Sequence, residues 1–208
     1  SILFDLKGKP VFSSQKEFTQ YFPKNGWVEH DPEEIWKTTI KTLRDVIQKV
    51  NKLKGEILTI GIANQRETTV LWDKKTGKAV YRAIVWQDRR TEDYCKKLRK
   101  QNKDTAIFNK TGLLIDPYFS GTKIKWILDN VPKAKYLMSK NQLLFGTIDS
   151  FLIWRLTKGK VHATDATNAS RTMIYNISSN KWDDAILNLL KIKKNILPEV
   201  KNCADDYG

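Results

Sequence analysis

Four polar residues, Asn64, Gln65, Arg66 and Glu67, follow directly on an apolar stretch that ends at Ala63. In open α/β sheets, ligands lie beyond the carboxyl ends of strands, and this tetrapeptide falls at such a place. An Arg beside a Glu offers fixed donors and acceptors together, which is the set that holds adjacent hydroxyl groups. A surface ion pair within a loop explains the same two residues equally well.

Two aromatic residues occupy comparable positions. Trp86 ends another apolar stretch, and its indole could lie against the carbon skeleton of a small polyol, although a tryptophan there is more often a core residue. Tyr118 stands just before a predicted helix, where its hydroxyl could bind a ligand or its ring could anchor the helix entry. Neither residue alone distinguishes between these alternatives.

Several familiar catalytic patterns are absent from the sequence. It contains no glycine-rich dinucleotide or phosphate loop, no His-Glu-x-x-His pair and no nucleophile elbow. The two histidines, His30 and His162, are expected to be structural or exposed, and Asp165 is expected to cap a turn rather than act as an acid. The sequence therefore offers binding residues more clearly than a known catalytic motif.

The elements that must position these residues are both strands and helices. Residues 57–63 form a short β-branched run, the pattern of a strand buried on both faces. A helix is expected to begin with Asp31 as N-cap and Pro32 in its first position, and apolar residues recur at steps of three and four as far as Val50. Together they predict an α/β fold with a mixed sheet flanked by helices.

Hairpins and shorter helices complete this prediction. Hairpins are expected for residues 2–14, turned at Gly8, and for residues 68–86. A short strand at 143–145 and a hairpin-like region at 161–175 follow. Six further segments show helical spacing or stop signals: residues 91–100, 105–110, 120–130, 133–139, 150–156 and 183–190.

The net charge of +14 would suit a nucleic acid or another polyanion. The lysines are scattered among acidic residues, however, which is typical of a solvated surface, so no specific nucleic-acid partner is expected. Cys95 and Cys203 lie far apart and are expected to be free thiols. No membrane span or secretion signal is recognised, and a cytoplasmic location is expected.

Five motifs, in order along essentially the whole chain, resemble the large family of carbohydrate kinases with the ribonuclease-H-like, actin-like ATPase fold. The motifs are GWVEHDP (26–32), NQRETT (64–69), IVWQDRRT (84–91), DPYFSGTK (116–123) and TNASRT (167–172). The second and fourth are similar to those of family members that act on glycerol rather than on xylulose or gluconate. Ala63, Phe151 and Ala166 depart from the family pattern, at positions that affect packing rather than the expected contacts.

This resemblance implies roles for the residues already singled out. Arg66 and Glu67 match the pair that hydrogen-bonds glycerol hydroxyls, and Tyr118 matches a further hydroxyl partner. Trp86 matches the aromatic wall against the carbon chain. The implied reaction is the ATP- and Mg²⁺-dependent phosphorylation of glycerol to glycerol 3-phosphate. A kinase for another small polyol or ketose is the nearest alternative, followed by a basic nucleic-acid-binding module and a scaffold without catalysis.

The resemblance also implies a division of the site. Residues 1–208 are expected to form one N-terminal, polyol-binding domain that lacks the first strand of the fold. The phosphate-cradling turn of the family would precede Ser1, and its proton-accepting Asp and nucleotide-binding domain would follow Gly208. The chain alone is therefore expected to be inactive and to work within a longer protein, which could form a homo-oligomer.

Overall fold

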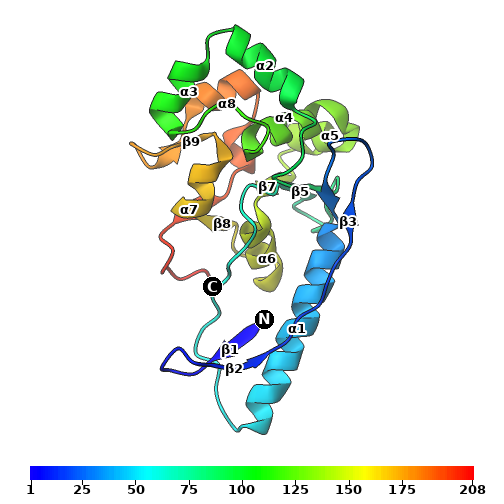
Figure 1. Ribbon diagram of the computed structural model, residues 1–208, viewed down its shortest axis with the longest axis vertical. Helices are drawn as coiled ribbons and strands as arrows, with labels where there is room; N and C mark the ends of the chain where they lie inside the picture. The colour runs from blue at the N-terminus through cyan, green and yellow to red at the C-terminus, as the bar shows by residue number, and fades with distance from the viewer.

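The computed structural model describes residues 1–208 as an α/β body from which one long helix and a hairpin project (Figure 1). The helix, α1 (Pro32–Lys52), begins where the Asp31 carboxylate accepts a hydrogen bond from the Glu33 N–H, with proline in the first turn. The start predicted from these residues is therefore confirmed. One side of α1 is buried, through residues that include Ile35 and Val46.

The hairpin predicted at the start of the chain is also confirmed. Strands β1 (Ile2–Phe4) and β2 (Pro10–Ser13) pair antiparallel, and Gly8 turns the chain with a φ of 75°. The hairpin lies beside α1, away from the body (Figure 1). Ser14 ties the two together, because its hydroxyl donates to the Asp45 carboxylate over 2.7 Å.

Residues 57–63 do not form the predicted strand. They run as unpaired chain from the end of α1 back to the body (Figure 1), and Leu58 and Ile60 are 70% and 57% exposed. The β-branched pattern is that of a strand buried on both faces, but a strand also needs a partner backbone. No other segment of residues 1–208 pairs with this one.

A buried antiparallel ladder runs through the body, between β5 (Val70–Asp73) and β7 (Leu143–Gly146). The sequence predicted β7 but paired the β5 region with residues 79–86 in a local hairpin. That hairpin also forms, in irregular shape, with antiparallel bridges between Thr69 and Ile84 and between Trp72 and Ala79. The strand β5 therefore has a neighbour on each edge, β7 on one and the irregular local hairpin on the other, and both of its faces are buried.

A second, three-stranded sheet stands beside this ladder. Its order is β3 (Gln20–Tyr21), β4 (Glu29–His30) and β6 (Ala83–Ile84), and both pairings are antiparallel. Strand β6 ends two residues before Trp86. This sheet therefore places the start of the Trp86 turn.

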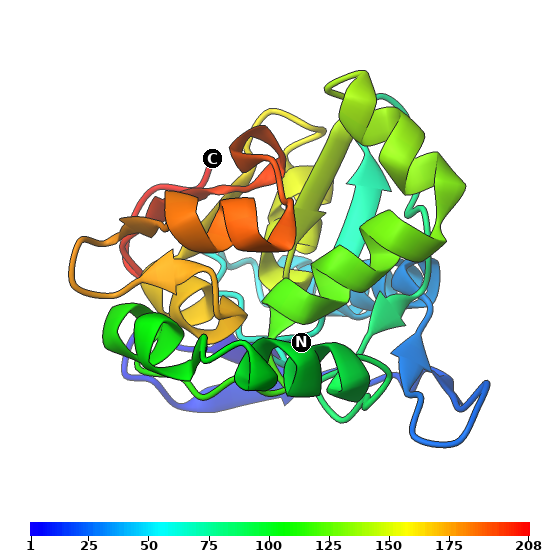
Figure 2. The same cartoon turned by 90° about the horizontal axis from the view of Figure 1, so that it is seen from above.

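Helices surround the ladder (Figure 2). All six that the sequence predicts are present, with ends within two residues of those expected. They are α2 (Glu92–Lys100), α3 (Asp104–Thr111), α4 (Ser120–Asn130), α5 (Pro132–Ser139), α6 (Ile148–Leu156) and α8 (Asp184–Leu190). None of the helices combines the length and apolar character needed to cross a membrane.

The region 161–175 is not the predicted hairpin. Strand β8 (Ala163–Asp165) pairs in parallel with β11 (Glu199–Lys201), which the sequence did not predict. The Asp165 carboxylate caps the next turn by accepting from the Asn168 N–H over 2.8 Å, as expected of it, and so ends the strand. The remaining short elements are α7 (Ala166–Ala169), η1 (Ser170–Thr172), β9 (Tyr175–Asn176), β10 (Lys181–Trp182) and η2 (Lys194–Ile196).

The main apolar core lies between the β5–β7 ladder and the surrounding helices. It includes Leu71, Phe145, Leu98, Ile124 and Leu190, all buried. Because these residues come from strands and helices far apart in the chain, their packing fixes the position of the first turn of α4 relative to β5. That relation determines where the candidate site residues meet.

Candidate functional site

Glu67 occupies a turn just before β5 and is 3% exposed. Its φ of 62° is in the left-handed region, which is uncommon for a residue other than glycine. Three side-chain donors surround its backbone carbonyl: the hydroxyls of Thr69 and Ser120, at 3.2 and 3.1 Å, and the Lys123 ammonium, at 3.4 Å. These contacts hold the strained turn in place.

The Glu67 carboxylate is paired with a cation from a distant segment. Arg171, in η1, donates from Nε to Glu67 Oε1 over 2.7 Å. The second carboxylate oxygen, Oε2, accepts no hydrogen bond from the protein. One oxygen is therefore fixed by the guanidinium, and the other can accept from a ligand.

Tyr118 and Trp86 meet at the same place. Their ring centroids are 5.3 Å apart with an interplanar angle of 51°, and each ring is half-buried. The Arg171 guanidinium lies 5.6 Å from the Tyr118 ring and 5.0 Å from the Phe119 ring, within the range of a cation–π contact. Arg171 thus joins the carboxylate of Glu67 to the aromatic pair.

Arg66 stands at the edge of this group. It is the chain neighbour of Glu67, is exposed, and makes no hydrogen bond or ion pair with another side chain. The structure therefore brings Glu67, Trp86 and Tyr118 together and leaves Arg66 beside them with its five donors free. The surface ion pair between Arg66 and Glu67 that the sequence left open is not formed, because Glu67 pairs with Arg171 instead.

The turn that carries Trp86 is held by a buried ionic network. Arg90 donates to Glu29 and Asp88 over 2.7 and 2.8 Å, and no part of its side chain is exposed. The Asp88 carboxylate also accepts from the Val28 N–H over 2.6 Å. Since Glu29 and Val28 lie in or beside β4, this network ties the Trp86 turn to the three-stranded sheet.

A second polar network holds the segment before Glu67. The Asn64 amide donates to Asp149 over 3.3 Å and to Asn168 over 3.0 Å, and Thr164 donates to Asp149 over 2.7 Å. Burial raises the pKa of Asp149, although the hydrogen bonds from its neighbours oppose that rise. Asn64 is therefore an anchor of the loop rather than a free ligand group.

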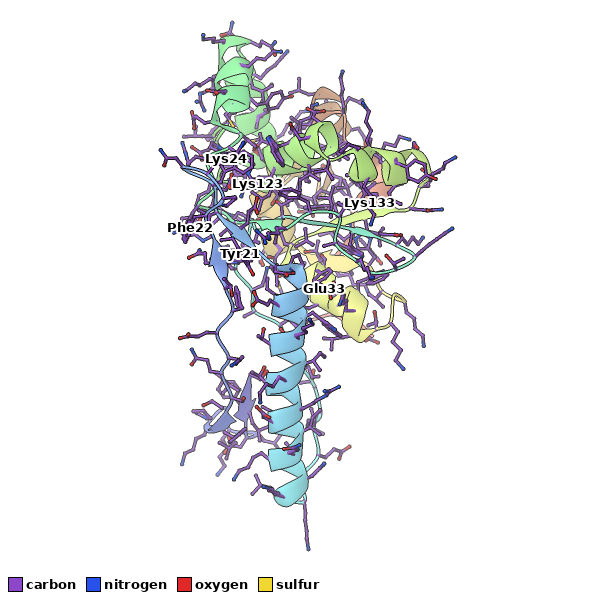
Figure 3. All side chains as sticks on the ribbon, turned by 90° about the vertical axis from the view of Figure 1, so that its right-hand side faces the viewer. Tyr21, Phe22, Lys24, Glu33, Lys123 and Lys133 are labelled. Atoms are coloured by element: carbon purple, nitrogen blue, oxygen red, sulfur yellow. The ribbon has the colours of Figure 1, made fainter.

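Lys123 lies beneath the site, in the first turn of α4. Its side chain is fully buried, and its ammonium donates to the Tyr118 carbonyl over 2.7 Å as well as to the Glu67 carbonyl. Burial lowers the pKa of this ammonium to about 7. It lies inside the body, above the upper end of α1 (Figure 3).

Sequence reasoning missed Arg171 and Lys123 as members of the site, although both occur in quoted motifs. Both contact Glu67, which is 104 and 56 residues away from them in the chain, so no local pattern links them to that residue. A lysine at a position where the helix would bury it was the one available signal. The histidines are structural, as expected: His162 bonds the Phe145 carbonyl over 2.7 Å, and His30 packs edge-on against Phe18.

Two hollows of the surface lie away from this group of residues. One of about 420 Å³ is at the end of α8, among Asp184, Asn188 and Lys191. Another, of about 270 Å³, separates α3 from α8. Neither hollow is lined by Glu67, Trp86 or Tyr118. The candidate site is identified by the chemistry of these side chains and not by the volume of a hollow. No group of three His, Cys, Asp or Glu side chains is placed to hold a metal ion.

Comparison with known proteins places this geometry in context. Residues 1–208 match the N-terminal domain of the FGGY family of carbohydrate kinases. The chain is 59% identical over 208 residues to the glycerol kinase of Malacoplasma penetrans (strain HF-2) and 55% identical over 208 residues to that of Rhizobium meliloti (strain 1021). All of this chain is covered in both, but only 41% and 42% of those proteins, so the chain spans about two fifths of their length.

Solved structures give the same result. The crystal structure of Plasmodium falciparum glycerol kinase with ADP has a TM-score of 0.95 and 37% identity, and covers 100% of this chain and 41% of that one. The ligand-bound xylulose kinase from Lactobacillus acidophilus has a TM-score of 0.84 and 28% identity, covering 96% and 39%. These likenesses confirm the predicted α/β, ribonuclease-H-like fold class.

Proposed function

This chain belongs to the FGGY family of carbohydrate kinases, and we propose that its 208 residues form the polyol-binding half of an ATP-dependent glycerol kinase. The relatives with 53–59% identity over the chain are glycerol kinases, which supports glycerol as the substrate. The product would be glycerol 3-phosphate. The proposal treats residues 1–208 as one domain of a longer protein.

The observation that carries this proposal is a set of polar groups that the protein itself leaves unpaired. Glu67 Oε2, the Tyr118 hydroxyl and the Arg66 guanidinium have no side-chain or backbone partner, although Glu67 is buried. None of these three groups is sealed from solvent, so each is open to a ligand. A small molecule with several adjacent hydroxyl groups would satisfy all three.

The arrangement suits a short polyol in a definite orientation. A hydroxyl can donate to Glu67 Oε2 while its oxygen, or that of its neighbour, accepts from Arg66. The Tyr118 hydroxyl can bond a further oxygen, and the face of Trp86 can cover the carbon chain. Phosphoryl transfer depends mainly on positioning and charge stabilisation, so the task of these residues is to aim one hydroxyl at the γ-phosphate.

The nucleotide side of the reaction is assigned to the rest of the protein. The relative from Plasmodium falciparum was crystallised with ADP, which supports ATP as the phosphate donor here. Mg²⁺ would neutralise charge on the phosphates, but residues 1–208 place no cluster of ligands for it. The proposal locates the reaction in the cytoplasm, where ATP is available.

A kinase for another small polyol or ketose is the second candidate. The likeness to the xylulose kinase from Lactobacillus acidophilus favours it, because the fold alone does not separate the two substrates. Comparing kcat/KM for glycerol and for xylulose in the full-length protein discriminates between the two.

The test of the proposed site is Glu67→Gln in the full-length protein. We expect kcat/KM for glycerol to fall about 10- to 100-fold, because a charge-assisted hydrogen bond to the substrate becomes a neutral one. Glu199→Gln is the matched control, since Glu199 is exposed on β11 and contacts none of the site residues. Equal kcat/KM in both variants would show that Glu67 does not bind the polyol, and failure of the wild type to phosphorylate any polyol would refute the function.

A further inference from the structure

We propose that Lys123 is a positioning residue of the polyol site, which sets the spacing of the Glu67 carboxylate and the Tyr118 phenol from beneath. This inference rests on the proposed function of those two residues. The Lys123 ammonium donates to the backbone carbonyl of each, over 3.4 and 2.7 Å. It is the one side chain of the structure that bonds both.

The need for such a residue follows from the backbone on which Glu67 stands. A left-handed turn at a residue with a side chain is maintained only where neighbours fix it. The segment before it, residues 57–63, is unpaired and exposed, and so supplies no ladder to do so. The Glu67 carbonyl is instead held by donors, and two of the three, Ser120 and Lys123, come from the first turn of α4.

The type of residue at position 123 argues for a role beyond packing. No carboxylate lies within ion-pair distance of its ammonium, although the side chain is wholly buried. A buried charge without a paired opposite charge is unfavourable, and an apolar side chain of similar size would fill the same space without that penalty. What an apolar residue cannot do is donate to two carbonyls at once.

Four charged side chains surround the Lys123 ammonium. The carboxylates of Asp88, Glu67 and Asp116 and the guanidinium of Arg90 face it from the neighbouring turns. Burial lowers the pKa of the ammonium to about 7, whereas glycerol carries no group that titrates between pH 6 and 9. The charge-assisted bonds to the two carbonyls are therefore present below pH 7 and weaken above it.

The experiment compares Lys123→Met with wild type in the full-length protein. We expect KM for glycerol to rise roughly tenfold in the variant, with a smaller fall in kcat and with KM for ATP within about twofold of wild type. Lys125→Met is the matched control, since Lys125 lies on the same helix but pairs with Asp129. A purely structural lysine would instead change thermal stability and lower the active fraction, leaving KM for glycerol unchanged.

A second measurement needs no variant. The dissociation constant of glycerol, determined by calorimetry without nucleotide, is expected to rise roughly threefold or more in wild type between pH 6 and 9, in keeping with a charge lost near pH 7. In Lys123→Met it is expected to be independent of pH over this range. A flat profile in wild type, or unchanged glycerol KM in a folded Lys123→Met protein, overturns the role of Lys123. Absence of glycerol binding by wild type would instead overturn the proposed function.

Discussion

At the scale of single residues, the site depends on ionised side chains that water scarcely reaches. Glu67 forms an ion pair with Arg171, whereas Lys123 donates only to backbone carbonyls. An ion pair offsets much of the unfavourable burial of a charge. Carbonyl dipoles offset less, so the pKa of Lys123 falls. The chemistry of the site is therefore linked to the stability of the fold around it.

That link gives a prediction for stability against pH. The folded-state pKa of Lys123 is about 7, below the ordinary value of 10.5, so above pH 7 the unfolded chain binds more protons than the folded chain. The contribution of Lys123 to the free energy of unfolding should thus increase from about pH 7 upward, by at most about 1.4 kcal/mol per pH unit.

Chemical denaturation of wild type and Lys123→Met between pH 7 and 9 measures this contribution as the difference between the two proteins. Other titrating groups cancel in that difference because both proteins share them. A difference that stays constant with pH would mean that the lysine keeps its ordinary pKa in the folded protein.

The residues of the site were only partly predictable from the sequence. Glu67, Trp86 and Tyr118 each follow or precede an element with a clear local pattern, and the structure brings them together. Arg171 and Lys123 could not be placed in the site, because their contacts depend on how η1 and α4 pack against the turn at Glu67. The binding roles of Arg66, Glu67, Trp86 and Tyr118 remain predictions that the proposed variants test.

At the scale of elements, the Arg90 network joins the Trp86 turn to β4. We predict that Arg90→Ala lowers the free energy of unfolding by about 3–5 kcal/mol, because it leaves Asp88 buried without a cation and Glu29 with only the distant, half-exposed Arg82. Arg82→Ala is the control, since Arg82 is 45% exposed and its contact with Glu29 is long, at 3.8 Å. This substitution should lower the free energy of unfolding by less than about 1 kcal/mol. Similar losses in both variants, measured by denaturation, would contradict the special role of the buried network.

Elements whose signals are local were predicted well. The Asp31 cap and the Pro32 start of α1, and the hairpin at Gly8, depend on neighbours a few residues away. The pairing of β5 with β7, and of β8 with β11, joins segments more than 30 residues apart. Nothing in the local sequence specifies such partners, and residues 57–63 show that a strong strand pattern without a partner forms no strand.

At the scale of the whole molecule, several exposed apolar side chains lie on the part that projects from the body. Leu58 and Ile60 are exposed on the unpaired segment, and Leu6 and Phe4 on the hairpin. Exposed apolar chain with free backbone groups tends to pair with other chains. The isolated 208 residues are therefore expected to self-associate as their concentration rises.

Ile60→Lys tests that expectation, because it adds a charge and removes an apolar side chain at an exposed position. The concentration at which light scattering detects association should rise several-fold. Thr59→Lys is the control, since it adds the same charge to the same segment without removing an apolar group. Association that is unaffected by Ile60→Lys, or reduced equally by Thr59→Lys, would indicate a different surface or a general effect of charge.

The bond between Arg171 and Glu67 joins two parts of the chain that are 104 residues apart. A molecule bound to the Glu67 carboxylate would be linked through Arg171 to η1. Through the Asn64–Asn168 hydrogen bond it would be linked to α7 as well. Ligand binding at the proposed polyol site would then restrict the motion of the C-terminal third. Binding and the rigidity of the domain would be coupled.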